Sequence, residues 1–262
     1  MASAAEIDRI ALRLFEAEQT GAPIAPPSRA TELELRDAYA VQLRNVERHE
    51  TAGRRLVGKK VGLTSRAMQE ALGVDQPDFG HLFEDMLLEN GGAVDRGRFI
   101  EPRVEPEIAF TMSADLIGPG IGPDDVRAAV ASAHPALEVI DSRVANWEIG
   151  LLDTVADNAS CGAVVIGEPA EWEEVDLAAV ECRLLVDGAV VETGLGSAVL
   201  GHPFAAVAWL ANTLSELETP VRAGDLVLPG SCTRAVPLET GTRAEADFGV
   251  LGTVSIAVEE GS

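Results

Sequence analysis

The 262-residue sequence contains little cysteine, few basic residues and no long apolar run. Its cysteines are an odd, sparse set without CxxC spacing: Cys161, Cys182 and Cys232. Such a set fits reduced thiols, and we expect a cytoplasmic protein. The apolar runs are shorter than the ~20 residues that a membrane-spanning helix needs, and the N-terminus lacks a basic segment followed by an apolar one. The sequence therefore predicts neither a membrane span nor a signal peptide.

Acidic residues outnumber basic ones by 43 to 20, which gives a formal net charge of −23 at pH 7. Nucleic acids and anionic membrane surfaces require a basic patch on a protein that binds them, so the charge argues against both as partners. A small anionic substrate remains compatible with this charge, because a local cation can capture it. Hydrophobic residues make up 47% of the chain, an ordinary globular proportion, and the chain is long enough to bury a large core.

The first part of the chain has the pattern of two helices. Residues 4–18 carry apolar side chains along one helical stripe, and Gly21 follows as a breaker. A second amphipathic helix is expected to begin after Ser28 or Thr31 and to end near Gly53. Nothing in these two helices indicates chemistry.

Short strand patterns dominate the chain from Leu56 onwards. We therefore predict an α+β fold, with a helical N-terminal region at 1–55 and one strand-rich catalytic unit at 56–262. Strands are expected at 56–63, 87–90, 98–110, 136–141, 162–166, 180–186, 189–193, 226–229 and 249–258.

Helices are expected to interrupt these strands at three places. One begins after Thr64 or Ser65 and contains Met68 and Leu72, and the others lie at 123–132 and 203–216. The segment 74–83 has the polar and glycine-rich composition of a loop, with aromatic anchors.

The segment Pro102-Arg-Val-Glu-Pro-Glu-Ile-Ala-Phe110 places two carboxylates at alternate positions. On a strand, Glu105 and Glu107 would therefore share one face, opposite an apolar face. Adjacent carboxylates at 4 Å repel each other by about 4 kcal/mol in a partly buried setting. Either open water or a divalent cation would offset this repulsion, and the segment alone leaves both alternatives open.

Glu138 interrupts a second apolar strand pattern, His134-Pro-Ala-Leu-Glu-Val-Ile140. A buried carboxylate is usually paired, protonated or bound to a metal, because isolated burial of a charge is costly. Its partner could be Arg143 or another basic group. Alternatively, Glu138 supplies a third carboxylate beside Glu105 and Glu107, and an all-oxygen set suits Mg²⁺, Mn²⁺ or Ca²⁺.

Other candidate functional residues are less distinctive. Lys59 and Lys60 lie in an apolar strand pattern and point to opposite faces, so we expect one of them to face inward. An inward Lys60 could bind a carboxylate or act as an acid or base with a lowered pKa. Asp78 and His81 lie in the expected loop, where either could be functional or a simple turn residue.

Seven segments share the pattern of one known family and follow its order along essentially the whole chain. They are Gly58-Lys-Lys-Val-Gly-Leu-Thr-Ser65, Asp75-Gln-Pro-Asp-Phe-Gly80, Pro102-Arg-Val-Glu-Pro-Glu-Ile-Ala-Phe110, Pro135-Ala-Leu-Glu-Val-Ile-Asp-Ser-Arg143, Asp153-Thr-Val-Ala-Asp-Asn-Ala-Ser-Cys-Gly162, Gly201-His-Pro-Phe204 with Ala208-Trp-Leu-Ala-Asn212, and Asp247-Phe-Gly-Val-Leu-Gly-Thr253. The sequence resembles the 2-keto-4-pentenoate hydratases, a group that includes 4-oxalocrotonate decarboxylase and belongs to the fumarylacetoacetate hydrolase superfamily.

This resemblance implies a mixed β-roll body and an active site. It implies a Mg²⁺ or Mn²⁺ ion held by Glu105, Glu107 and Glu138, and proton transfer or substrate orientation by Lys60 and Asp78. The remaining candidates for substrate contact are Ser160, Ser231 and Thr233; the last two lie in a strand-ending turn with small hydroxyl donors.

The implied reaction is the addition of water to 2-hydroxypenta-2,4-dienoate, which gives 4-hydroxy-2-oxopentanoate in the degradation of aromatic compounds. Alternatives are 4-oxalocrotonate decarboxylation, hydration of a longer or carboxylated dienoate, acylpyruvate hydrolysis, and a non-catalytic subunit. The resemblance also implies a homo-oligomer, and a pathway decarboxylase or aldolase is a possible partner.

Overall fold

The computed structural model describes residues 1–65, 69–70, 74–217 and 219–261. Within these residues the helices are α1 (Ala4–Thr20), α2 (Pro27–Ala30), α3 (Leu35–Thr51), α5 (Pro123–Ala129), α6 (Leu151–Ala156) and α7 (Pro203–Ser215). None of them is long and apolar enough to cross a membrane. The expected helix that contains Met68 and Leu72 lies outside the described residues.

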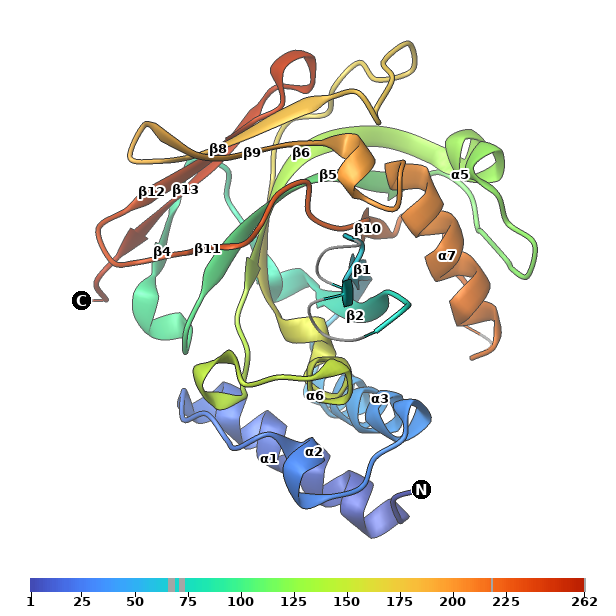
Figure 1. Cartoon of the computed structure of the whole chain (residues 1–262), viewed down its shortest axis with the longest axis vertical. Helices are drawn as coiled ribbons and strands as arrows, with labels where there is room; N and C mark the ends of the chain where they lie inside the picture. Colours follow the sequence, from blue (N-terminus) through green and yellow to red (C-terminus); the bar gives the residue numbers. More distant parts are fainter. Residues whose placement is uncertain (66–68, 71–73, 218, 262) are drawn as a thin grey trace.

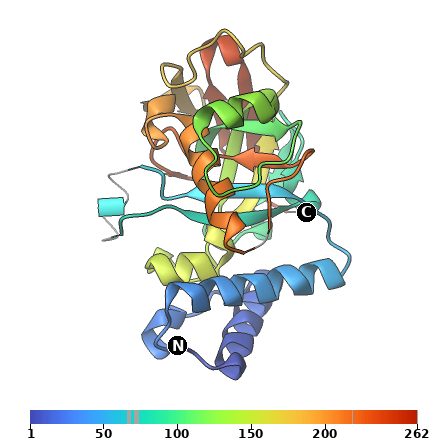
Figure 2. The ribbon, with the colours of Figure 1, turned by 90° about the vertical axis from the view of Figure 1, so that its right-hand side faces the viewer.

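The N-terminal helices form a layer beneath the strand-rich body (Figure 2). α1 begins where the Ser3 side chain accepts a hydrogen bond from the Glu6 N–H and Glu6 bonds back to Ser3, and it ends at Gly21 in a left-handed conformation (φ 66°). α1 and α3 pack through apolar side chains that include Ile10, Leu14 and Val41. The two helices expected from the sequence are therefore confirmed.

The body consists of two sheets (Figure 1). The eight-stranded sheet has the order β2-β1-β10-β5-β6-β7-β3, with β11 also paired to β5, and the five-stranded sheet has the order β4-β13-β12-β8-β9. The strands are β1 (Leu56–Gly62), β2 (Asp78–Phe83), β3 (Leu87–Leu88), β4 (Ala93–Asp95), β5 (Arg103–Met112), β6 (Val130–Ile140), β7 (Cys161–Ile166), β8 (Glu181–Val186), β9 (Ala189–Leu195), β10 (Leu226–Leu228), β11 (Val236–Pro237), β12 (Arg243–Asp247) and β13 (Thr253–Glu259).

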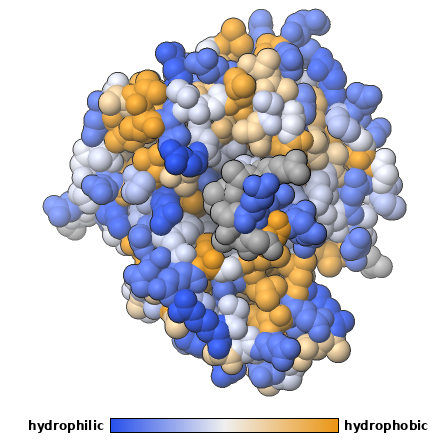
Figure 3. All heavy atoms as spheres, viewed as in Figure 1, coloured by the Kyte–Doolittle hydropathy of each residue, from blue (hydrophilic) through white to orange (hydrophobic). Residues whose placement is uncertain are grey.

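The main hydrophobic core lies between the sheets and α7, and it includes Ile108, Phe110 and Leu137. The opposite face of β5 and β6 contributes Ala109 and Ala136 to a second cluster, which α3 reaches through Val46. Both faces of these strands are therefore covered. On the surface shown in Figure 3, hydrophilic side chains alternate with apolar patches.

Helices and strands are both present, and the α+β prediction is confirmed. The assignment of 74–83 to a loop was wrong in its second half, because β2 (Asp78–Phe83) is a fully buried strand paired with β1. Expected boundaries also shifted: the helix at 123–132 ends at Ala129, and the last strand begins at Thr253. The division of the chain at residue 55 into two regions stays a prediction.

Candidate metal centre and active site

Strands β5 and β6 bring three carboxylates together. Their antiparallel register places Glu105 opposite Glu138, and Glu107 follows two residues after Glu105 on the same face. Oxygen atoms from Glu105, Glu107 and Glu138 lie within 4.8 Å of one another. Glu107 and Glu138 are fully buried, whereas Glu105 is partly exposed. The apolar side chains between them face the main core, as the alternating pattern predicts.

These carboxylates are incompletely paired. Glu107 Oε2 accepts a hydrogen bond of 2.8 Å from the Gly230 N–H. Among the described residues Glu107 Oε1 and Glu138 Oε1 have no hydrogen-bond partner, and Glu138 Oε2 has only an ion pair of 3.3 Å with Lys60 Nζ. At 4.8 Å, two such charges repel by roughly 3.5 kcal/mol at an effective dielectric constant of 20. Burial, followed by the Glu138 charge, raises the pKa of Glu105 to about 7 and raises the pKa of Glu107 well above its usual range.

This donor set fits a hard divalent cation. Mg²⁺ and Mn²⁺ prefer carboxylate oxygens, and buried oxygens without a donor offer the lone pairs that such an ion requires. Open water, the alternative that the sequence left for Glu105 and Glu107, is excluded for Glu107, because its side chain is fully buried. Ligation of an ion by these three residues stays a proposal.

Lys60 of β1 is buried beside the carboxylates. Its Nζ lies 3.3 Å from Glu138 Oε2 and donates a hydrogen bond of 3.0 Å to the Ala159 carbonyl. Burial alone would lower the pKa of Lys60, but the charges of Glu138 and Asp78 outweigh burial and raise the pKa above its usual value. The lysine is therefore a charged donor, and the lowered pKa considered from the sequence is not found.

The sequence predicted that one lysine of the pair faces inward and that Arg143 or another basic group pairs with Glu138. Lys59 is also buried, on the opposite face, with its Nζ 3.5 Å from Asp225 Oδ2, so both lysines of the pair face inward. Arg143, the suggested partner of Glu138, instead pairs with Asp157 (Nε to Oδ1, 2.6 Å). Lys60 is the basic group beside Glu138.

Asp78 of β2 lies close to Lys60. Its Oδ2 accepts a long hydrogen bond of 3.4 Å from Thr154 Oγ1, which is 3.3 Å from Ser160 Oγ. Asp78 Oδ1 is buried and has no hydrogen-bond donor among the described residues. A Cβ at Gly62 would lie 2.2 Å from this oxygen, so only glycine leaves room for it. Burial raises the pKa of Asp78 against the lowering effect of Lys60.

The backbone at 158–160 helps to shape this site. Asn158, Ala159 and Ser160 all have left-handed φ angles, of 55°, 50° and 55°. The Asn158 side chain fixes the turn to β2, because it accepts from the His81 N–H (2.8 Å) and donates to the His81 carbonyl (2.9 Å). Such a conformation is costly for non-glycine residues, and it directs the Ala159 carbonyl towards Lys60.

The remaining predicted residues divide into two groups. Ser160 is buried in the Asp78 network, and Ser231 forms a backbone bridge with Glu107. The Thr233 hydroxyl instead donates to the Arg234 carbonyl, and no contact with the glutamates is found for it in the described part of the chain. Contact of Ser160, Ser231 and Thr233 with substrate stays a prediction.

His81, considered together with Asp78, lies on the other face of β2. Its Nδ1 is 3.0 Å from Gln42 Oε1, and Gln42 Nε2 donates to the carbonyls of Phe79 and Val155. Since both amide hydrogens of Gln42 are used, the His81 ring donates its Nδ1–H. Burial, with a smaller effect of Lys59, lowers the pKa of His81 to about 3. His81 is therefore neutral and structural.

Sequence reasoning missed three contributors to the site: the Gly230 N–H, the Ala159 carbonyl and the Thr154 hydroxyl. The two backbone groups leave no side-chain signal in a sequence. Thr154 lies within the segment 153–162 that carried the family resemblance. The resemblance could have indicated that Thr154 is near the site, but not that its hydroxyl donates to Asp78.

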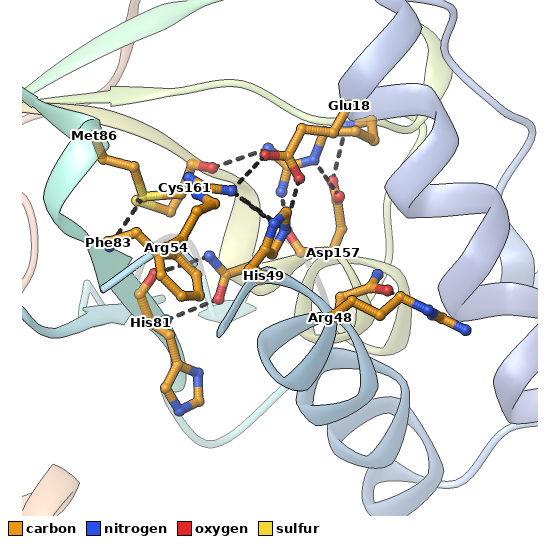
Figure 4. Close-up of polar contacts among 12 residues, drawn as sticks. Glu18, Arg48, His49, Arg54, His81, Phe83, Met86, Asp157 and Cys161 are labelled. Atoms are coloured by element: carbon orange, nitrogen blue, oxygen red, sulfur yellow. Dashed lines mark hydrogen bonds and ion pairs between the residues drawn. The ribbon is translucent and has the colours of Figure 1, made fainter. Parts of the chain in front are cut away.

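A separate polar cluster joins the helical layer to the body. Figure 4 shows Glu18 facing His49 and Arg54, whose guanidinium lies over the Phe83 ring. Burial raises the pKa of Glu18, but His49, Arg143 and Arg54 together lower it to about 2. A cavity of about 470 Å³ adjoins this cluster. The charged groups of this cluster pair with one another, which is typical of a structural role rather than of a binding site.

Comparison with known proteins agrees with this geometry. The sequence model of the fumarylacetoacetate (FAA) hydrolase C-terminal family matches residues 41–259. The chain is 43% identical to 2-hydroxyhexa-2,4-dienoate hydratase of Comamonas testosteroni, with 95% of this chain and 96% of the relative covered. It is 41% identical to 2-keto-4-pentenoate hydratase of Paraburkholderia xenovorans (strain LB400), with 96% and 94% covered.

Solved structures show the same fold. The structure of 4-oxalocrotonate decarboxylase from Pseudomonas putida G7, complexed with magnesium and adipate, superposes with a TM-score of 0.96 at 37% identity, with 98% of this chain and 99% of that chain covered. Fumarylpyruvate hydrolase from Pseudomonas aeruginosa shares the fold at a TM-score of 0.61 and 19% identity, with 79% and 90% covered. The family resemblance expected from the sequence is confirmed: this chain belongs to the fumarylacetoacetate hydrolase C-terminal family.

Proposed function

We propose that the protein is a metal-dependent hydro-lyase that adds water to 2-hydroxypenta-2,4-dienoate and gives 4-hydroxy-2-oxopentanoate. The observation that carries the proposal is the cluster of Glu105, Glu107 and Glu138, whose donor-free oxygens lie beside Lys60 and Asp78. Relatives named as hydratases of such dienoates are 41–46% identical to the chain, and most match over nearly its whole length.

The residues present can divide the chemistry between them. Glu105, Glu107 and Glu138 would hold a Mg²⁺ or Mn²⁺ ion, which would act as a Lewis acid towards the enol oxygen of the substrate. In the conversion the enol oxygen loses a proton and C5 gains one, and water then adds as a hydroxyl at C4 and a proton at C3. Asp78 Oδ1 is a buried acceptor outside the carboxylate cluster that has no donor among the described residues, and we assign to it the orientation of the attacking water and the removal of its proton.

Lys60 has a different role from Asp78 because its pKa is raised. A permanently charged ammonium group orients neighbouring oxygens and stabilises negative charge that develops in the transition state. Its position is set by Glu138 and by the Ala159 carbonyl, so it is preorganised for this purpose. We assign substrate contact to Ser160, which lies in the Asp78 network, and to Ser231, which bridges Glu107 through the backbone.

A second candidate function is decarboxylation of 4-oxalocrotonate. The close superposition on the Pseudomonas putida G7 decarboxylase favours it, whereas the dienoate hydratases among the relatives match at higher sequence identity. Both reactions require the same carboxylate cluster, so the substrate and the product must distinguish them. A homo-oligomer, a cytoplasmic location and a partner decarboxylase or aldolase stay predictions from the sequence.

The test is a spectrophotometric assay with freshly generated 2-hydroxypenta-2,4-dienoate, with and without Mg²⁺ or Mn²⁺. We expect loss of the dienoate absorbance together with formation of 4-hydroxy-2-oxopentanoate, only when the ion is present. A parallel reaction with 4-oxalocrotonate is followed by release of CO₂. Rapid CO₂ release without hydration of the dienoate would replace the hydratase by the decarboxylase.

A further inference from the structure

Arg103 begins the strand that carries the carboxylate cluster. It is the first residue of β5 and lies on the same face as Glu105 and Glu107, because alternate strand residues share a face. Two strand residues span about 6.8 Å, so Arg103 lies one step outward from Glu105. Solvent exposure increases in the same direction, from the fully buried Glu107 to the partly exposed Glu105 and Arg103. Arg103 therefore lies at the open end of the cluster.

The Arg103 guanidinium is held by an aromatic ring. Its central carbon lies 4.5 Å from the centroid of the Trp147 ring. Trp147 is itself fixed, because its Nε1–H donates a hydrogen bond of 2.9 Å to the Glu101 carbonyl and its backbone is left-handed (φ 54°). Stacking on a ring engages the face of a guanidinium and leaves its N–H edge available for a planar anion.

Among the residues that the structure describes, no acidic side chain pairs with that edge. Within the described part of the chain, the Arg103 guanidinium makes neither a hydrogen bond nor an ion pair. Its polar interaction there is the cation–π contact with Trp147. Its N–H donors are therefore available to an incoming anion, in a chain with 43 acidic and 20 basic residues. Arg103 is close enough to Glu105 for its charge to act on that carboxylate, so it lies within electrostatic reach of the cluster.

Lys60 is less available than Arg103 to bind an incoming anion. Its Nζ is already engaged by Glu138 and by the Ala159 carbonyl, in the buried interior of the site. An incoming anion at the open end would first meet a guanidinium whose donors are unused. A planar guanidinium fork matches a carboxylate in a bidentate arrangement.

We propose that Arg103 binds a carboxylate of the substrate at the open end of the site, and that Trp147 is the residue that positions it. The inference rests on the proposed dienoate hydratase function and adds the residue that captures the anion. A net charge of −23 repels an anionic substrate from most of the surface, and Arg103 supplies a local attraction at the entrance.

The test begins with Arg103→Gln, measured at saturating Mn²⁺. We expect KM for 2-hydroxypenta-2,4-dienoate to rise at least tenfold while kcat changes less than threefold, because ground state and transition state lose the same contact. Added salt should raise the wild-type KM by screening, and it should affect the variant less. Arg13→Gln, at an exposed arginine of α1, is the control with the same change in charge and should leave KM unchanged.

Further variants separate positioning from charge. Arg103→Lys keeps the charge without the planar fork and should fall between wild type and Arg103→Gln. Trp147→Leu should raise KM less than Arg103→Gln does, and its KM should respond to salt as in wild type. An unchanged KM in Arg103→Gln for both the dienoate and a dicarboxylate analogue would overturn the proposal. An equal rise for both identifies the carboxylate that they share, and a rise for the dicarboxylate alone identifies its distal carboxylate.

Two controls complete the design. If Arg103 only neutralises the glutamates, Arg103→Gln would change the Mn²⁺ affinity in calorimetry and leave KM at saturating Mn²⁺ unaltered, which would refute substrate binding. Calorimetric binding of 2-oxopentanoate to the Mn²⁺-loaded protein requires no turnover. At least tenfold weaker binding in Arg103→Gln would therefore support the Arg103 assignment even if wild type failed to hydrate the dienoate.

Discussion

Substitution of Glu107 by glutamine tests the metal centre without disturbing the fold. Glutamine has nearly the same shape as glutamate, and its amide oxygen can still accept the hydrogen bond from the Gly230 N–H. The substitution removes one of three charges whose oxygens lie within 4.8 Å of one another. Because burial and the charge of Glu138 raise the pKa of Glu107 and disfavour its ionised form, the ion-free variant should be at least as stable as ion-free wild type.

Binding of the ion should show the opposite effect. At an Mn²⁺ concentration of 100 Kd, the ion stabilises the folded wild type by about 2.7 kcal/mol. For a chain of this size, this corresponds to a rise in Tm of roughly 5–10 °C. At the same concentration, Glu107→Gln should show a rise below about 2 °C, because a buried charge of the ligand set is missing. Turnover of the dienoate should be lost as well.

The assay is a thermal unfolding scan with and without Mn²⁺, accompanied by the spectrophotometric assay. Glu259→Gln, at an exposed position of β13, changes the same chemical group away from the site and should keep the wild-type rise in Tm. A rise in Glu107→Gln equal to that of wild type, or undiminished activity, would refute the assignment of Glu107 as a ligand.

Other residues give independent tests. Asp78→Asn should lower kcat by about 10²–10⁴-fold and keep the Mn²⁺-induced rise in Tm. Loss of the Mn²⁺-induced rise in Tm together with loss of activity would contradict a role of Asp78 in proton transfer. Gln42→Leu leaves two buried carbonyls and the His81 Nδ1–H without partners and should lower the free energy of unfolding by at least about 3 kcal/mol in urea titrations. With its pKa lowered from 6.5 to about 3, His81 takes up a proton more readily in the unfolded chain. Its contribution to stability is therefore complete above pH 6.5 and falls by about 1.4 kcal/mol per pH unit below it. Between pH 6.5 and 4.5 the stability of His81→Gln should thus fall less steeply than that of wild type, and equal slopes would contradict the burial argument.

Part of the site was predictable from alternation alone. The spacing of Glu105 and Glu107 predicts that they share a face, and an acidic residue within an apolar strand pattern singles out Glu138. Periodicity assigns a residue to a face but does not give the register between two strands. The pairing of Glu105 with Glu138 is therefore visible only in the folded sheet.

The errors have physical causes. β2 contains Asp78 and Gly80, which are poor strand formers, but it is buried on both faces and pairs with β1 along its length. Tertiary packing here outweighs local propensity. The expectation that one lysine of a neighbouring pair stays outside assumed a sheet with one wet face. Both Lys59 and Lys60 are buried because the sheet is covered on both sides and each side provides a carboxylate.

The left-handed turn at 158–160 has a consequence for protein engineering. The group that orients Lys60 there is a main-chain oxygen, which every amino acid possesses, so the side chain at position 159 carries no chemical instruction. The requirement at position 159 is conformational: the residue there must adopt a φ near 50°. A variant library that excludes β-branched residues at position 159 would preserve the direction of the Lys60 side chain. A valine at that position would disfavour the left-handed turn and so change the direction of Lys60, although no ionisable group is altered.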